Sequence, residues 1–214
     1  MNRAARAARW GWVVLMLLLA ACAPMRPQRP VGAALPGEAA QALRCVDRWS
    51  LRGRAAFRIP GSSGSFRLNW QQQDDRYRLA LEGPLGAGAM RIEGDAAEVV
   101  VESKGERRVY AAAPELVLAQ ILGYELPLQS LRYWVLGLSD PHVGPATWGF
   151  VGAETGEPVL RQAGWTVRYE EWTPSLSPVF LPARLILERE DIFLRVLIEH
   201  WDLDPTQLCP VGRS

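Results

Sequence analysis

The chain has 214 residues, a formal net charge of +1 at neutral pH and 49% hydrophobic residues. This length suits one globular domain of ordinary size, and the even charge balance argues against a nucleic-acid-binding protein, which would carry a basic stripe. Nine tryptophans are many for such a chain. They indicate an aromatic core, although a cavity for apolar ligands would require the same residues.

The first 21 residues have the pattern of a secretion signal. Arginines at positions 3, 6 and 9 precede an apolar run from Trp10 to Ala20, which is too short to cross a bilayer that needs about 20 residues. The run ends in Leu19-Ala20-Ala21-Cys22, which resembles the lipobox of bacterial lipoprotein precursors. In such precursors the signal is cleaved before the cysteine. An ordinary cleaved signal that happens to be followed by cysteine is the alternative.

Lipidation of Cys22 would hold the mature protein at a membrane without crossing it. The expected groups are a covalent diacylglycerol on the thiol and an N-acyl chain, with no further cofactor. Several acyl chains, at about 0.8 kcal/mol per buried methylene, make such anchoring stable. Four prolines among residues 23–40 then predict an extended tether. In lipoproteins an aspartate after the cysteine usually retains the protein in the inner membrane, so Ala23 favours the outer one.

The next segments predict a short helix followed by a β-meander. The helix is expected from Glu38 to Asp47. Apolar and polar residues then alternate from Trp49 to Ile59, which predicts a half-buried strand. Similar patterns predict strands with one wet face at Phe66–Gln71, Tyr77–Glu82, Met90–Glu93, Glu98–Glu102 and Arg107–Tyr110, with Lys104-Gly105 as a hairpin turn.

A glycine-rich connection, Gly83-Pro84-Leu85-Gly86-Ala87-Gly88, joins two of these strands. Pro84 presets a turn, and the glycines allow the chain to reverse. Leu85 then lies at the tip with no core behind it, which forgoes about 1.5–3 kcal/mol of burial unless another partner receives the side chain. Local sequence alone does not separate this reading from a leucine that folds back onto the sheet edge.

Two helices interrupt the strands in the middle of the chain. Pro114 opens the first, which runs through Leu122 to Gly123. The second follows Pro127 and closes at Gly137. A long Pro-Gly-rich loop is expected from Ser139 to Pro158, before strands at Gly164–Trp172, Pro182–Glu188 and Ile192–Leu203. This order predicts an antiparallel sheet curved around a helical plug or lid.

The sequence offers little for catalysis. His142 lies in a loop, and His200 lies in a predicted strand, where a lone histidine is usually structural. No cluster has metal-ligand spacing, and no serine lies in a nucleophile elbow, so we expect neither an enzyme nor a metal site. After export, Cys45 and Cys209 could form a disulfide or stay as free buried thiols. The sequence leaves that choice open.

Several segments together resemble the LolB family of outer-membrane receptors in the lipoprotein-sorting pathway. The most specific stretch is Leu126-Pro-Leu-Gln-Ser-Leu-Arg-Tyr-Trp-Val-Leu-Gly137. The similarity covers almost all of the mature chain and is weakest in the 139–158 loop and after Leu203. The other matching segments are Trp49–Phe57, Asn69–Gln72, Tyr77–Gly86 and Gly164–Tyr169.

The resemblance implies a mainly β protein with helices: an incomplete antiparallel β-barrel whose helical lid encloses an apolar cavity. Family members take lipoproteins from the periplasmic carrier LolA and place them in the inner leaflet of the outer membrane. The implied partners are therefore LolA, acylated lipoprotein cargo and outer-membrane phospholipid, with the protein a monomer anchored in that leaflet and facing the periplasm. The family's exposed membrane-insertion leucine matches Leu85, between Pro84 and Gly86.

The expected organisation is a signal peptide at 1–21, a lipidated tether at 22–40, a LolB-like domain at 41–205 and a tail at 206–214. Two alternatives stay open: a structural or assembly lipoprotein of the cell envelope that binds no acyl chains, and a hydrolase or glycan-binding module. Periodicity places side chains on a face without showing what fills it, so each candidate for the acyl-chain cavity could be ordinary core. The candidates are Phe57, Phe66, Leu68, Trp70, Leu79, Leu81, Met90, Ile92 and Trp134.

Overall fold

The computed structural model describes residues 38–84, 88–151, 156–176 and 179–210. The predicted signal peptide, the lipidation site Cys22 and residues 23–37 of the tether lie outside these ranges. Leu85 and Gly86 also lie outside them, whereas Pro84 is described and exposed. The described residues belong to one compact unit.

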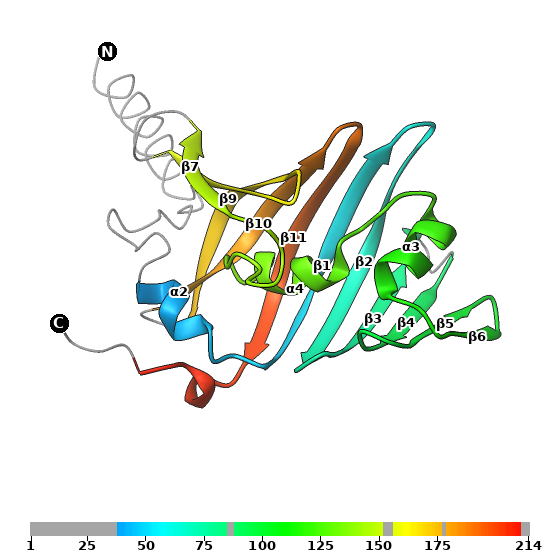
Figure 1. The fold of residues 1–214 in the computed structure, drawn as a ribbon, viewed down its shortest axis with the longest axis horizontal. Coiled ribbons are helices and arrows are strands. Elements are labelled where there is room, and N and C mark those ends of the chain that lie inside the picture. The colour runs from blue at the N-terminus through cyan, green and yellow to red at the C-terminus, as the bar shows by residue number, and fades with distance from the viewer. Residues whose placement is uncertain (1–37, 85–87, 152–155, 177–178, 211–214) are drawn as a thin grey trace, which may run out of the picture. The chain divides into compact units, whose positions relative to one another are not determined.

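The described residues form a single antiparallel sheet of eleven strands (Figure 1). Its order is β6-β5-β4-β3-β2-β1-β11-β10-β9-β8-β7, so the first and last strands of the chain meet in the middle of the sheet. The strands are β1 (Arg48–Ile59), β2 (Ser62–Gln73), β3 (Arg76–Glu82), β4 (Met90–Gly94), β5 (Val99–Ser103), β6 (Glu106–Tyr110), β7 (Thr147–Val151), β8 (Glu157–Gln162), β9 (Trp165–Leu176), β10 (Val179–Arg189) and β11 (Ile192–Leu203).

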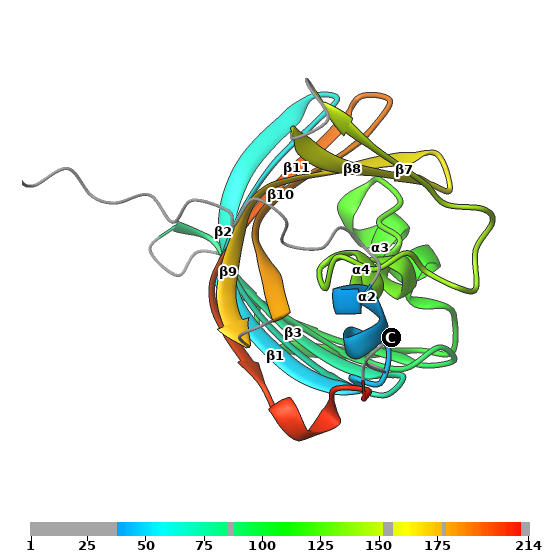
Figure 2. The ribbon, with the colours of Figure 1, turned by 90° about the vertical axis from the view of Figure 1, so that its left-hand side faces the viewer.

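The sheet curves strongly, and the helices lie inside the curve (Figure 2). These are α2 (Glu38–Leu43), α3 (Pro114–Leu122) and α4 (Leu128–Trp134). The edge strands β6 and β7 do not pair with each other. The predicted incomplete barrel, mainly β with helices across its open side, is confirmed.

Alternation along the strands decides which face is buried. In β1, Trp49, Leu51 and Ala55 are buried, whereas the intervening arginines are exposed. The side-chain period of two along a strand causes this division, and it confirms the predicted wet face, which is the convex one. The predicted hairpin turn between β5 and β6 is also confirmed: Lys104 and Gly105 both have positive φ, at 53° and 79°, as a type I′ turn requires.

The helix ends follow their sequence signals. Pro114 opens α3, and Gly123 ends it with a φ of 81° and an N–H donated to the Ala119 carbonyl. After α4, Gly137 adopts a φ of 79°, and the Leu138 N–H donates to the Tyr133 carbonyl at 3.0 Å. This pattern is a Schellman motif, in which only glycine turns without strain.

The prediction of a long loop from Ser139 to Pro158 is wrong. The segment from Ser139 to Pro158 contains the whole of β7 and the start of β8. In β8, Pro158, Val159 and Leu160 are all buried, so the strand lacks the alternation of a half-buried strand. The glycines and prolines of the 139–158 segment also favoured a loop. A strand covered on both faces does not show a period of two.

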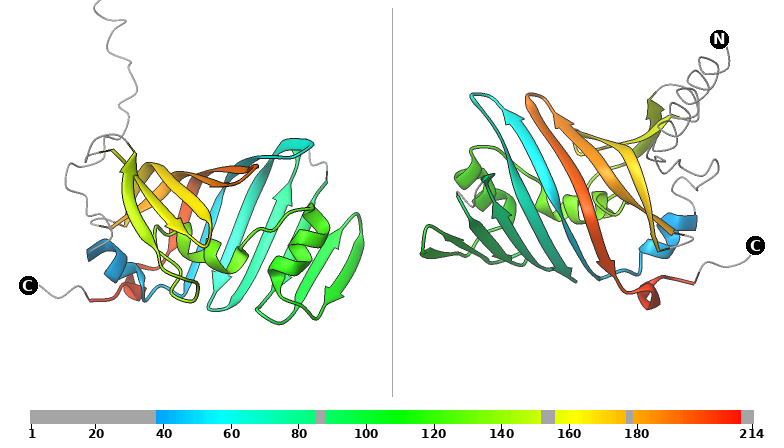
Figure 3. Two further views of the ribbon diagram at one scale, coloured as in Figure 1. Left: turned by 45° about the horizontal axis from the view of Figure 1, so that its top comes forward. Right: turned by 180° about the vertical axis from the view of Figure 1, so that it is seen from behind.

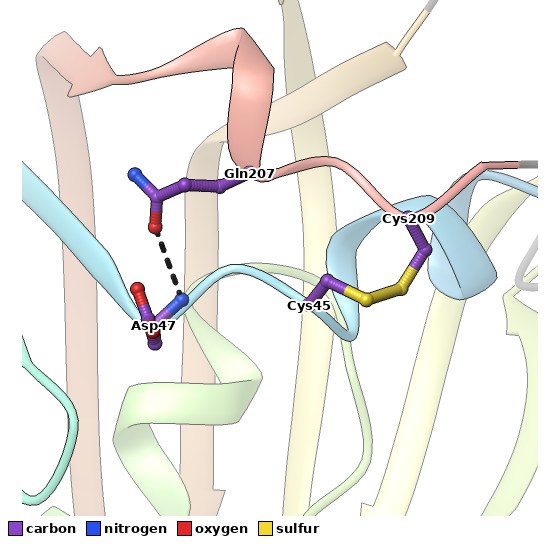
Figure 4. The surroundings of a disulfide bond; sticks show 4 residues. All are labelled: Cys45, Asp47, Gln207 and Cys209. Carbon is purple, nitrogen blue, oxygen red and sulfur yellow. Dashed lines mark hydrogen bonds between the residues drawn. A yellow bond between two sulfur atoms is a disulfide. The ribbon is translucent and has the colours of Figure 1, made fainter.

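A disulfide joins the two ends of the domain. Cys45, just after α2, is bonded to Cys209, with the two Cα atoms 5.3 Å apart (Figure 4). The Cys209 N–H donates to the Ala42 carbonyl at 2.9 Å. The Gln207 side chain accepts hydrogen bonds from the N–H groups of Asp47 and Arg48. The disulfide that the sequence left open is present, and it ties the segment expected as a tail to the start of the domain.

Candidate functional site

The concave face of the sheet carries rows of side chains that run across the strands. In one row, each residue pairs with the next across neighbouring strands from β1 to β5: Leu51, Trp70, Leu79, Ile92 and Val101. All five are buried, and none is more than 6% exposed. Four of the nine cavity candidates, Trp70, Leu79, Ile92 and Trp134, therefore lie in the packed core.

The other five candidates form a half-buried surface, here called the apolar strip. Leu68 pairs with Leu81, and Leu81 with Met90, across β2, β3 and β4. Farther along β2, the rings of Phe66 and Phe57 lie 6.2 Å apart. The strip therefore consists of Phe57, Phe66, Leu68, Leu81 and Met90, which pack against the core and remain partly exposed.

The strand lengths explain why one end of the strip, at Phe57 and Phe66, is open. β3 ends at Glu82, which pairs with Arg67, so residues 62–66 of β2 extend beyond their β3 partner. Phe57 lies over this extension, where it faces Gly64. A Cβ at Gly64 would lie 2.9 Å from the Phe57 ring, so this glycine makes room for the ring. The unequal strands thus leave large apolar side chains only partly covered.

A cavity of about 810 Å³ lies between α2, α4 and the start of β7. Its lining includes Leu43, Trp49 and Trp148 together with charged residues such as Arg44 and Asp47. The Arg132 guanidinium donates to the Asp75 carboxylate at 2.6 Å, which fastens α4 to the β2–β3 turn. None of the nine candidates lines this cavity. Sequence reasoning missed it because its walls come from separate segments of the chain.

A buried polar network, here called the polar latch, holds α4 to the sheet. It consists of Ser130, Trp134, Asp140 and Gln162. The Gln162 side-chain oxygen accepts from the Trp134 indole N–H at 3.0 Å and from the Asp140 backbone N–H at 2.9 Å. Its amide nitrogen donates to the Asp140 carbonyl at 2.7 Å, and the Ser130 hydroxyl donates to the Asp140 carboxylate at 2.7 Å.

The latch also went undetected in the sequence. Asp140 lies in a Ser-Asp-Pro turn, which could have indicated local side-chain bonding. Gln162 carries no such signal, because its partners are about twenty residues away in the chain. A buried amide is stable only when its donors and acceptors are satisfied, and here they are.

Two buried tyrosines have perturbed pKa values. Burial raises the pKa of Tyr169, whose hydroxyl donates to the Trp134 carbonyl at 3.0 Å. Burial also raises the pKa of Tyr77, and the nearby carboxylates of Glu115 and Asp95 raise it further. The Tyr77 hydroxyl has no hydrogen-bond partner among the described residues.

The described residues show no catalytic or metal-binding arrangement. No group of three or more histidine, cysteine or carboxylate side chains in those ranges could hold a metal ion. His142 and His200 are both exposed. Within the same part of the chain, no helix is long and apolar enough to cross a membrane. What the described residues form is an apolar surface on the concave side of the sheet, next to the helices.

An open, strongly curved antiparallel sheet with helices on its concave side places this chain in the class of mainly β domains built on a single curved sheet. The family model described as "Outer membrane lipoprotein LolB" matches residues 47–201. This chain therefore belongs to the LolB family, which acts in lipoprotein localisation at the outer membrane and is not a known enzyme family.

Curated relatives agree with this assignment. The outer-membrane lipoprotein LolB of Alkalilimnicola ehrlichii is 37% identical over 190 residues, which cover 88% of this chain and 94% of the relative. The LolB of Chromohalobacter salexigens is 35% identical, covering 91% and 90%. Among solved structures, a LolA superfamily protein from Nitrosomonas europaea has a TM-score of 0.49 at 11% identity, covering 78% of this chain and 94% of that one.

Proposed function

We propose that this protein accepts acylated lipoproteins from the periplasmic carrier LolA and inserts them into the inner leaflet of the outer membrane. The observation that carries the proposal is the apolar strip. Five large apolar side chains share one face and are only partly covered by the protein's own helices. Apolar area left uncovered forgoes stabilisation of about 25 cal/mol per Å², so its retention supports a role in binding acyl chains.

The energetics of acyl chains require a direct handover. A triacylated lipoprotein carries tens of methylenes, and exposing each to water costs about 0.8 kcal/mol. Release into the periplasm would cost tens of kcal/mol, so cargo must pass between apolar surfaces while carrier and receptor are in contact. The direction of transfer would then follow from tighter binding in the receptor and from the bilayer as the final site.

The volume available is compatible with this role. The cavity beside α4, at about 810 Å³, lies within the range of roughly 300–1,000 Å³ for small-molecule sites. Its lining of apolar and charged residues suits a ligand with an apolar chain and a polar end. Lipidated Cys22 would hold the receptor, as a monomer, at the inner leaflet. Leu85, between Pro84 and Gly86, would enter the membrane during delivery.

The acceptance step can be tested on neighbouring residues of one strand. Leu68 belongs to the apolar strip, whereas Asn69 is exposed on the convex face. In the full mature chain carrying Cys22→Ala, we expect Leu68→Glu to lower transfer of a labelled lipoprotein from LolA at least tenfold. Asn69→Glu places the same charge on the other face and should leave transfer unchanged. Equal transfer by both variants would remove the strip from the mechanism.

The delivery step is tested separately with Leu85→Glu. This variant should fold and accept cargo normally, because the strip is intact, but it should fail to deliver cargo into liposomes. Normal delivery would exclude Leu85 from insertion. Purified protein that contains no fatty acid or detergent, and that takes no cargo from LolA, would instead favour a structural lipoprotein of the envelope.

A further inference from the structure

Charge is divided unevenly between the two ends of strands β2 to β6. The end that adjoins the β3–β4 connection comprises the described residues of 62–69, 79–91 and 102–108, and it carries five basic and three acidic side chains. The opposite end, residues 70–78 and 92–101, carries two basic and five acidic ones. The sheet therefore has a basic end and an acidic end.

The cations of the basic end are incompletely neutralised. Register places Glu102 between Arg91 and Arg107 on neighbouring strands, and its carboxylate lies 3.7 Å from one guanidinium and 3.8 Å from the other. One carboxylate thus serves two arginines, whose side chains are 73% and 57% exposed. Among the described residues, Arg67 and Lys104 form no ion pair.

These cations share a recess with part of the apolar strip. The recess has a volume of about 610 Å³, and its lining includes Leu81 and Met90 as well as Arg91, Lys104 and Arg107. Carboxylates of Glu82, Glu102 and Glu106 also line it. Glu106 is engaged with Arg108 at 2.7 Å, and Glu102 is shared between two arginines. The lining thus holds three cations and three carboxylates beside its apolar side chains, and Arg67 and Arg108 add the excess positive charge of the basic end from outside the recess.

We propose that this basic end docks on an anionic phospholipid surface, with Lys104 and Arg107 as its main contacts to lipid phosphates. The inference rests on the proposed function and adds the headgroup charge that delivery requires. Phospholipid offers both chemistries of the recess: phosphate for the cations and acyl chain for Leu81 and Met90. An acidic protein surface would match only the cations. The acidic end of the same strands would be repelled by the membrane, which orients the domain.

The test measures vesicle binding without cargo. The full mature chain with Cys22→Ala is sedimented with vesicles of phosphatidylcholine alone or mixed with phosphatidylglycerol. We expect binding only to the mixed vesicles, and weaker binding as salt is raised. Each Lys or Arg near an anionic surface contributes about 1 kcal/mol, or roughly fivefold in affinity. Lys104→Gln with Arg107→Gln should therefore lower binding about 25-fold.

The matched control removes two cations at the acidic end of the same strands. Arg76→Gln with Arg78→Gln makes the same change in net charge on exposed side chains, and it should leave vesicle binding within about twofold. Equal losses in both double variants would show a net-charge effect and overturn the proposal. The proposal would also be overturned if the Cys22→Ala protein, with no change at the basic end, bound the two vesicle types equally.

Two further outcomes separate this inference from its rivals. If the Lys104/Arg107 variant binds vesicles normally but loses transfer from LolA, the basic end is a protein-docking surface and the lipid proposal fails. Cargo acceptance should be unchanged in the variant, because Leu68 and the rest of the strip are intact. A protein that binds anionic vesicles as expected yet accepts no cargo would contradict the proposed function and leave the docking surface supported.

Discussion

Two of the helices on the concave side, α3 and α4, are attached in different ways. α4 is held by the polar latch, by the Tyr169 hydroxyl and by Arg132, with Trp134 fully buried beneath it. α3 buries Pro114, Val117 and Leu118, and its Glu115 accepts one hydrogen bond from the Gln129 N–H. Leu116 on α3 is 65% exposed. One helix is latched, and the other rests mainly on apolar contacts.

This difference separates a rigid side of the fold from an adaptable one. Buried polar networks fix a unique geometry because every member needs its partners. Apolar contacts are not directional, so α3 can shift at smaller cost. In Figure 1, α4 lies in front of the middle of the sheet and α3 in front of β3 and β4, the strands that carry Leu81 and Met90 of the strip. The surface beside the less constrained helix can therefore change its shape at smaller cost.

The disulfide should give the largest effect, because it fastens α2 on the rigid side. It closes a loop with a sequence separation of 164 residues, and the loss of a native disulfide costs about 4 kcal/mol. We expect urea unfolding under reducing conditions to show that loss. Cys45→Ser with Cys209→Ser should match the reduced protein and be insensitive to reductant. A change below about 1 kcal/mol would show that the hydrogen bonds around Gln207 suffice.

Breaking the latch should have the next largest effect. Gln162→Leu keeps the volume but strands the indole N–H of Trp134 and the backbone groups of Asp140. Each buried polar group left unpaired costs about 1–3 kcal/mol, so we expect a loss of about 3 kcal/mol in the free energy of unfolding.

The matched control for the latch is Gln72→Leu. Gln72 is also buried, and it bonds the Trp70 indole N–H and the Asp74 carbonyl. It serves fewer partners, so its loss should be smaller, at about 1–2 kcal/mol. Equal losses from the two variants, measured by chemical denaturation, would show that the number of partners of the buried amide does not set the cost of removing it.

Substitution of the two buried tyrosines by phenylalanine should have the smallest effects on the free energy of unfolding. Tyr169→Phe removes a hydrogen bond worth about 1 kcal/mol. Tyr77→Phe removes a buried hydroxyl that has no partner among the described residues, so stability at neutral pH should stay the same or rise. A loss of more than about 1 kcal/mol in Tyr77→Phe would show that its hydroxyl is satisfied.

The two tyrosines also predict that the stability of the fold depends on pH in the alkaline range. Both pKa values are raised in the folded state, so the unfolded chain loses these protons first, at a pKa of about 10. Their contribution to stability is complete below that pH and is lost as the pH rises above it. The free energy of unfolding should fall beyond about pH 10, and the fall should be smaller in Tyr77→Phe. Denaturant titrations at several pH values provide the measurement.

Patterns that span a few neighbouring residues were predicted well. β1, β2 and β3 alternate (Figure 3, right, shows the sheet from behind), and Gly123 and Gly137 turn the chain after α3 and α4 where local sequence indicated. β8 was missed because three consecutive buried residues remove the period of two. β7, which is largely exposed, was missed because the glycines and prolines around it favoured a loop. Of the nine cavity candidates, four lie in the core and five in the apolar strip, since periodicity does not reveal what covers a face.

The sequence by itself determined the LolB resemblance, the lipidation motif, the curved antiparallel sheet and its wet face, because these depend on local periodicity and short motifs. Tertiary structure alone decided the disulfide between Cys45 and Cys209, the partners of Gln162, and the uneven strand lengths that open one end of the strip. Each of these depends on residues far apart in the chain coming into contact. Such contacts follow from the packing of the whole sheet.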